Sequence, residues 1–93
     1  FPMSVQQYNV YGLKAAYEGQ VDWGQTILEK GVEVFDKSEV LWDSLATVYA
    51  MNDNNESALK ASNKAVQFAR EHQSKYISEI EVQNSDLKKQ TEN

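Results

Sequence analysis

The sequence contains no cysteine, one proline and one histidine among its 93 residues. Without cysteine it has no disulfide, no thiolate nucleophile and no cysteine metal site. It also lacks an apolar run near the roughly 18 residues that cross a bilayer, and no charged-then-apolar leader opens it, so we expect neither a membrane span nor a signal peptide within it. Because the chain begins at Phe1 rather than at a Met, we interpret it as a piece of a longer protein.

Basic residues are also fewer than acidic ones. The sequence has nine Lys and Arg and fourteen Asp and Glu, which gives a net charge of -5. Binding to phosphates needs a basic face, so this balance argues against a nucleic-acid partner. The charge is uneven, since residues 18–56 are mainly acidic and residues 57–75 mainly basic. We interpret the basic stretch, where Lys60 and Lys64 are one helical turn apart, as a solvated helix face rather than a docking patch.

The sequence does contain an internal repeat with an offset of 34 residues. The equivalent residues of the two units are Tyr8, Tyr11, Gly12 and Ala15 in the first and Trp42, Leu45, Ala46 and Tyr49 in the second. The same register continues with small residues, which are Gly24 and Gly31 in the first unit and Ala58 and Ala65 in the second. A repeat of this length indicates stacked pairs of helices.

This pattern resembles the tetratricopeptide repeat family, whose helix-turn-helix unit carries a large aromatic, a Leu, a small residue and a Tyr, followed by two Ala. The resemblance implies an all-α domain over residues 1–93 that forms a short α-α superhelix. Its repeats would span about 5–38 and about 39–72, with a capping helix at about 74–90. It also implies a scaffold whose partners are set by variable surface residues.

Capping signals place the first two helices. Ser4 with Gln7 three residues later forms a capping box for a helix that runs to about Glu18, where Gly19 supplies a left-handed C-cap. Asp22, again followed three residues later by a Gln, is expected to begin the second helix. Gly31 lies inside that helix at a cost of about 1 kcal/mol relative to Ala, so we expect a close approach of the first helix there.

The remaining helices follow from similar signals. A third helix should start after Ser38 and end at the polar cluster 52–55, and a fourth should run to about Glu71. In the last helix, Tyr76 and Ile80 keep the repeat register while Glu79 and Gln83 break it. We expect this helix to cover the fourth one with Tyr76, Ile77, Ile80 and Leu87 while its other face stays polar.

Aromatic residues are expected to fall into two groups. Those at repeat-defining positions should pack in the interior; they are Tyr8, Tyr11, Trp42, Tyr49 and Tyr76. Tyr17 and Trp23 lie outside these positions, so we expect them to be partly exposed and available to a partner.

Few residues are candidates for catalysis or for metal binding. His72 is expected at the end of the fourth helix, where a cation interacts favourably with the helix dipole. Ser74 and Glu71 lie near it, but adjacent helix-terminal side chains provide no pre-organised oxyanion site. The carboxylates Asp22, Asp36, Asp43 and Asp53 are assigned to helix ends or exposed faces, so we predict no metal, no cofactor and no enzyme activity for this chain.

A concave face is the expected binding surface, since peptide-binding relatives in the resembled family use the free side of the first helix of each pair. On this register it comprises Gln6, Asn9, Leu13, Ala16 and Tyr17 from the first helix and Val40, Asp43, Thr47 and Met51 from the third. None of these residues is basic, and Leu13 and Thr47 stand where carboxylate-clamp relatives carry Asn. The resemblance therefore implies a protein or peptide partner other than a free C-terminal carboxylate.

A second resemblance covers residues 38–49, which are similar to a signature in tetratricopeptide tails of bacterial serine hydrolases of the esterase and beta-lactamase-related kinds. Residues 9–12 similarly resemble the opening of those tails, whereas Asp36 and Lys37 replace a usual Pro. This resemblance implies a C-terminal accessory module of a larger, extracytoplasmic or periplasmic enzyme. Two functions therefore stay open, an independent protein-interaction scaffold and an accessory module that modulates its own parent enzyme.

Overall fold

The computed structural model describes residues 3–92, and this part of the chain folds into five α helices without a strand. The helices are α1 (Val5–Tyr17), α2 (Val21–Val34), α3 (Glu39–Met51), α4 (Asn55–Glu71) and α5 (Ile77–Thr91). The predicted all-α class and the predicted number of helices are therefore confirmed for the described residues. None of these helices combines the length and the apolar character that crossing a membrane would need.

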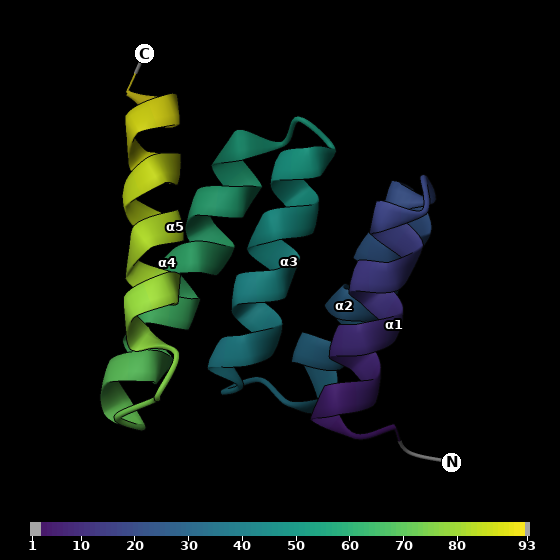
Figure 1. The fold of residues 1–93 in the computed structure, drawn as a ribbon, viewed down its shortest axis with the longest axis horizontal. Coiled ribbons are helices and arrows are strands. Elements are labelled where there is room, and N and C mark those ends of the chain that lie inside the picture. Colours follow the sequence, from purple (N-terminus) through teal and green to yellow (C-terminus); the bar gives the residue numbers. More distant parts are fainter. Residues whose placement is uncertain (1–2, 93) are drawn as a thin grey trace.

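The helices form two layers in a flat molecule of 40 × 30 × 18 Å. In Figure 1, α1, α3 and α5 make up the nearer layer and all run in the same direction. Behind them, α2 lies against α1, and α4 passes behind α5. Consecutive helices are thus antiparallel, and the chain advances from α1 at one end of the molecule to α5 at the other.

Most helix ends follow the predicted capping signals. The Ser4 hydroxyl accepts from the Gln7 amide while the Gln7 side chain accepts from the Ser4 amide, which completes the capping box. Gly19 has φ = +95° in the left-handed region that only glycine adopts freely. Ser38 caps α3 by accepting a backbone N–H bond from Leu41. Asn54, in the cluster that was expected only to end the third helix, also caps α4 by accepting from the Ser57 amide.

The prediction that Asp22 begins the second helix is wrong. The helix starts at Val21, with Gln20 as a cap that makes no side-chain hydrogen bond. Asp22 therefore lies in the first turn, where the positive end of the helix dipole favours a carboxylate. Its Oδ1 instead accepts a 2.8 Å bond from Nδ2 of Asn52 at the end of α3, so the residue joins two helices rather than starting one.

The crossing of α1 and α2 depends on glycine. A Cβ atom at Gly24 would lie 2.5 Å from the carbonyl oxygen of Gly12, and one at Gly12 would lie 2.5 Å from Cγ of Leu28. At Gly31, as predicted, α1 comes close: a Cβ there would lie 3.1 Å from Cβ of Tyr8. The helices therefore approach until backbone meets backbone, a distance that no side chain at residue 24 permits.

The buried interior is mainly aliphatic. Only some of the aromatic residues that were predicted to pack there do so. Tyr8 is 7% exposed, and Trp42 is half-buried between the two hydrophobic clusters of the molecule, with Nε1 donating to the carbonyl oxygen of Asp36 at 2.7 Å. Tyr11 and Tyr76, however, are 50% and 44% exposed, so their predicted packing is wrong. Tyr11 lies on a side of α1 that no described helix covers, and Tyr76 is the residue that precedes α5.

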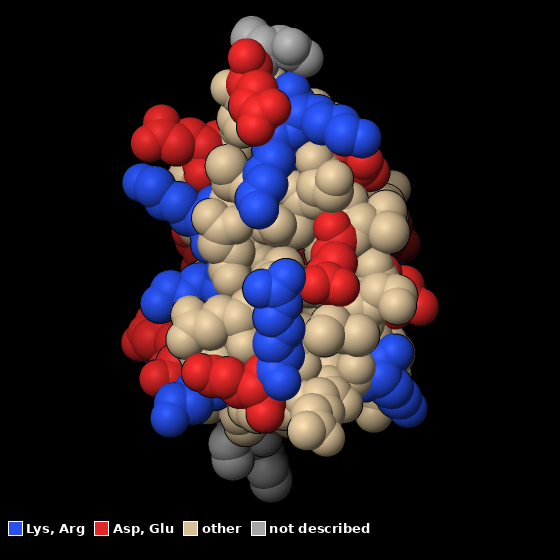
Figure 2. Space-filling view, turned by 90° about the vertical axis from the view of Figure 1, so that its left-hand side faces the viewer, with Lys and Arg blue, Asp and Glu red and all other residues tan. Residues whose placement is uncertain are grey.

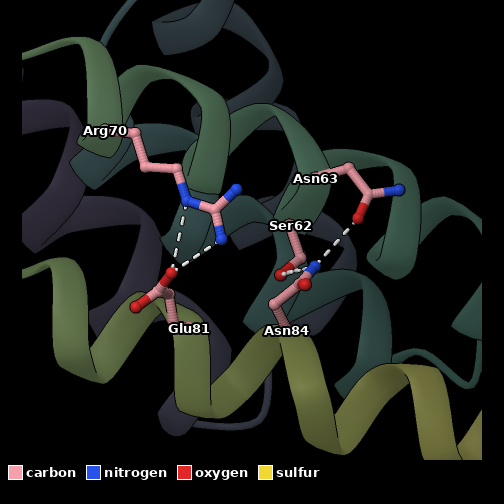
Figure 3. Close-up of polar contacts among 5 residues, drawn as sticks. All are labelled: Ser62, Asn63, Arg70, Glu81 and Asn84. Atoms are coloured by element: carbon pink, nitrogen blue, oxygen red, sulfur yellow. Dashed lines mark hydrogen bonds and ion pairs between the residues drawn. The ribbon is translucent and has the colours of Figure 1, made fainter.

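The last helix covers α4 largely as predicted, although it starts at Ile77 rather than near residue 74. Ile80 and Leu87 are buried. Polar contacts set the pairing of α4 with α5, as Figure 3 shows: Nδ2 of Asn84 donates to Ser62 and Asn63, and Arg70 binds Glu81 at 2.8 Å. The outer surface at the α5 end carries Lys, Arg, Asp and Glu interspersed among uncharged residues (Figure 2).

We expect Gly24→Ala to lower the free energy of unfolding by about 1–3 kcal/mol, because the new methyl group would clash with a backbone carbonyl that cannot move alone. The loss should occur although Ala favours a helix over Gly by about 1 kcal/mol. Urea denaturation monitored by circular dichroism provides the measurement. Thr26→Ala, an exposed change on the same helix, is the control, and a variant at residue 24 as stable as this control would contradict the close crossing.

Trp42→Ala should lower the free energy of unfolding by about 3–5 kcal/mol, because the indole ring connects both hydrophobic clusters. Trp23→Ala should cost far less, since that ring is 57% exposed. Denaturant titrations of the two variants give the comparison. Equal losses would show that Trp42 does not connect the two clusters.

Candidate functional site

A groove of about 660 Å³ opens across the layer formed by α1, α3 and α5. Each helix contributes residues from its N-terminal half, because the three helices run in the same direction (Figure 1). The lining comprises Val5, Gln6, Asn9 and Val10 of α1, Val40, Asp43 and Ser44 of α3, and Tyr76, Glu79 and Ile80 at α5. We call this surface the three-helix groove.

The groove brings together four residues of the predicted concave face, which are Gln6, Asn9, Val40 and Asp43. Thr47 lies one turn beyond Asp43 and is bonded to α5. Leu13 packs against the hydrophobic core, and Ala16 is 2% exposed where Gly24 approaches it. Tyr17 and Met51 are exposed at the ends of α1 and α3 and do not line the groove.

Six groove residues were not predicted from the sequence, which are Val5, Val10, Ser44, Tyr76, Glu79 and Ile80. Tyr76 was assigned to packing, and its exposed ring instead forms part of the lining. The usable signal was the break in the repeat pattern at Glu79, where a carboxylate replaces the residue that the register requires. A charged residue at a register position that should be packed indicates that the position faces solvent or a ligand.

Hydrogen bonds fix the floor of the groove. The Ser44 hydroxyl donates to Oδ1 of Asn9, which ties α3 to α1. Nε2 of Gln83 donates to Oδ1 of Asp43 at 2.8 Å and to the Asp43 carbonyl oxygen at 3.1 Å, while Oε1 of Gln83 accepts from Thr47 at 2.8 Å. Gln83 therefore fixes α5 against α3, and the groove walls are held in place before a ligand arrives.

Asp43 is the electrostatic centre of the groove. Burial raises the pKa of its carboxyl above the ordinary value, and repulsion from the Glu79 carboxylate adds to this, while the hydrogen bond from Gln83 opposes it. Both effects make the negative charge costly in the free protein. A cationic group placed between Asp43 and Glu79 would relieve that cost, and among residues 3–92 no Lys, Arg or His lines the groove.

His72, the residue considered for catalysis, takes a structural position. It ends α4, and its ring stacks on the ring of Phe68 with the two ring centres 6.2 Å apart. Its Nδ1 lies 2.9 Å from Oε1 of Glu39 at the start of α3. Ser74 lies close enough to the same carboxylate to help lower the pKa of Glu39. In a nucleophile-base relay the imidazole stands between the hydroxyl and the carboxylate, whereas here the carboxylate stands between the other two groups.

The other residues considered in the sequence also make structural contacts. Lys60 pairs with Glu56, and Lys64 lies over the ring of Trp42 at 5.9 Å from its centre. Within residues 3–92, no group of three or more His, Cys, Asp or Glu side chains is arranged to hold a metal ion. Family models, curated proteins and solved structures were compared with this chain, and none of them matches it.

The contact between Glu39 and His72 predicts how stability depends on pH. Although burial opposes ionisation, hydrogen bonds from His72, its own backbone and Ser74 together lower the pKa of Glu39 below its ordinary value. A carboxyl with a lowered folded-state pKa stabilises the protein above its unfolded-state pKa and loses this contribution as the pH falls through the folded-state value. The free energy of unfolding should therefore decrease as the pH falls below about 4.5, the ordinary pKa of a Glu carboxyl.

Glu39→Gln should reduce stability at pH 7 and make the decline at acidic pH shallower than in the unsubstituted chain. Denaturant titrations at pH 7, 5 and 3 measure both effects. Glu33→Gln, which changes an exposed carboxylate of α2, is the matched control. Identical pH profiles for Glu39→Gln and for the unsubstituted chain would contradict the assigned contact.

Proposed function

We propose that this chain is a non-catalytic, tetratricopeptide-like helical scaffold that binds a protein segment in the three-helix groove. The observation that carries the proposal is the composition of the groove: aliphatic and aromatic walls surround two acidic side chains, and none of the described residues that line it is basic. Binding sites for short segments combine such apolar contact area with a few polar groups that fix orientation. A helical stack supplies them from several helices at once.

The ligand that this groove fits is a peptide with a Lys or Arg next to an aliphatic side chain. The cation would lie between Asp43 and Glu79, where it relieves the cost of a partly buried negative charge. The aliphatic side chain would lie against Val10 and Val40, which are only partly covered in the free protein. The net charge of -5 would attract such a peptide from a distance.

The alternative function, an accessory module of a bacterial hydrolase, rests on the resemblance over residues 38–49. In that segment Ser38 caps a helix, Leu41 and Leu45 are buried, and Trp42 bonds to the backbone before α3. These contacts account for the similarity as helix packing, so they favour neither function. Three groove residues, Val40, Asp43 and Ser44, belong to that segment, and the other groove residues lie outside it. The composition of the whole groove favours the interaction scaffold.

The proposal predicts charge-selective peptide binding. Short fluorescent peptides with a central Lys, Gln or Glu flanked by Leu should bind in the order Lys, Gln, Glu in fluorescence polarisation. Asp43→Asn and Glu79→Gln should each weaken binding of the Lys peptide roughly tenfold, because each removes one partner of the cation. Glu33→Gln, a carboxylate on α2 outside the groove, should leave binding unchanged.

Stability measurements separate this role from a structural one. The raised pKa of Asp43 means that its ionised form costs stability above that pKa, and the cost disappears as protonation proceeds at lower pH. Asp43→Asn keeps an oxygen that accepts from Gln83, so this variant should be at least as stable as the unsubstituted chain at pH 7. Equal binding of the Lys and Glu peptides, or a loss of stability in Asp43→Asn, would contradict the proposed function.

A further inference from the structure

A second surface lies on the outer side of α1 and α2, at the end of the molecule opposite α5 (Figure 1). It is a shallow groove of about 430 Å³ that is separate from the three-helix groove. Its lining comprises Met3, Tyr11, Lys14, Ala15, Glu18, Gln20, Trp23 and Ile27. Tyr11 and Trp23 are the main apolar features, because half or more of each side chain is exposed. We call this surface the α1/α2 face.

The internal repeat shows what kind of element fits the α1/α2 face. Tyr11, Ala15 and Glu18 correspond, at the offset of 34 residues, to Leu45, Tyr49 and Asn52 of α3. On α3 these three positions meet another helix: Leu45 is 1% exposed, the Tyr49 hydroxyl donates to Glu29 of α2, and Asn52 donates to Asp22 of α2. The equivalent positions of α1 have no such cover among the described residues: Tyr11 and Glu18 are exposed, and Ala15 is partly exposed.

Lys14 and Glu18 identify the helix that would cover the α1/α2 face. They lie one turn apart on the side of α1 that also carries Tyr11 and Ala15. Neither makes an ion pair with another described residue. Lys14 lies in the last turn of α1, where the helix dipole favours a cation, whereas Glu18 ends α1, where the dipole opposes a negative charge. Both side chains are exposed and remain available to charged groups of a partner.

We propose that a second copy of this chain covers the α1/α2 face and forms a two-fold symmetric dimer. In an antiparallel pairing of two α1 helices, Lys14 of each copy faces Glu18 of the other, so these exposed side chains form two ion pairs across the interface. Ala15 lies between them, and its small side chain lets the two helices cross closely. Tyr11 and Trp23 of each copy then pack over the crossing and lose their exposure to water. Such self-complementarity is what a two-fold interface requires.

The size of the α1/α2 face predicts a weak dimer. A helix of about 13 residues is roughly 20 Å long, and two helices side by side are roughly 20 Å wide. The face therefore offers about 400 Å² per copy in projection, or about 800 Å² over both copies, which is below the range of about 1,200–2,000 Å² that stable interfaces bury in total. The two copies also carry net charges of the same sign, so association should depend on protein concentration and dissociate on dilution.

Sedimentation velocity at protein concentrations from about 1 µM to about 1 mM tests the proposal, because this range covers the dissociation constants of weak dimers. We expect the mass to rise from monomer toward dimer, and Trp23→Ser to keep the chain monomeric throughout. Lys14→Glu and Glu18→Lys should each weaken the dimer roughly tenfold or more, because each places like charges opposite one another. The double variant K14E/E18K should restore it, since the two ion pairs then form with their charges exchanged.

Val82→Ser on α5, which changes a side chain 62% exposed at the opposite end, is the matched control and should leave the dimer intact. Circular dichroism checks that each variant remains folded. A chain that stays monomeric at the highest concentration would overturn the proposal and leave the face to a different helix. A dimer that is insensitive to Trp23→Ser and to the charge exchanges would also overturn it, because the copies would then meet through another surface.

Discussion

The close crossing of α1 and α2 is the contact on which the positions of the other helices depend. Gly24 lies against the backbone of Gly12, so no side chain separates the two helices there. This lets Leu28 become fully buried over Gly12. One turn further on, Gly31 leaves room for the ring of Tyr8 and for Leu41 of α3 at the same point. A wider crossing would separate these residues and displace α3, because the packed interior has little space to adjust.

The three-helix groove follows from that arrangement. Since α3 is held against α1 and α2, its N-terminal half lies beside that of α1, and the bond between Ser44 and Asn9 fixes this alignment. Two sets of contacts then position α5, which are its apolar packing against α4 and the hydrogen bonds from Gln83 to α3. The groove is therefore a consequence of the way the layer is built, and its polar floor consists of the contacts that hold the layer together.

The number of helices and most of their ends could be predicted, because these depend on neighbours within four residues. Ser4, Gly19, Ser38 and Asn54 act through local backbone hydrogen bonds or local dihedral angles. Asp22 carried the same local signal, but a bond from α3 decided its role. Tyr11, Tyr76 and Glu79 were misplaced or missed for a related reason: a repeat specifies which positions face a neighbouring helix, but not whether a neighbour is present. The groove lining depended on that missing information.

Two polar residues inside the layers, Asn84 and Asp43, differ in what they contribute to folding. Asn84 is 6% exposed, yet it is neutral and its amide donates to two partners on α4, so it fixes the pairing of two helices at little cost. Asp43 has a bond from Gln83 and still ionises less readily than an ordinary carboxyl. An Asn at this position would accept the same bond without the charge. Folding alone therefore does not require a carboxylate there, and the proposed cationic ligand would give it a physical reason.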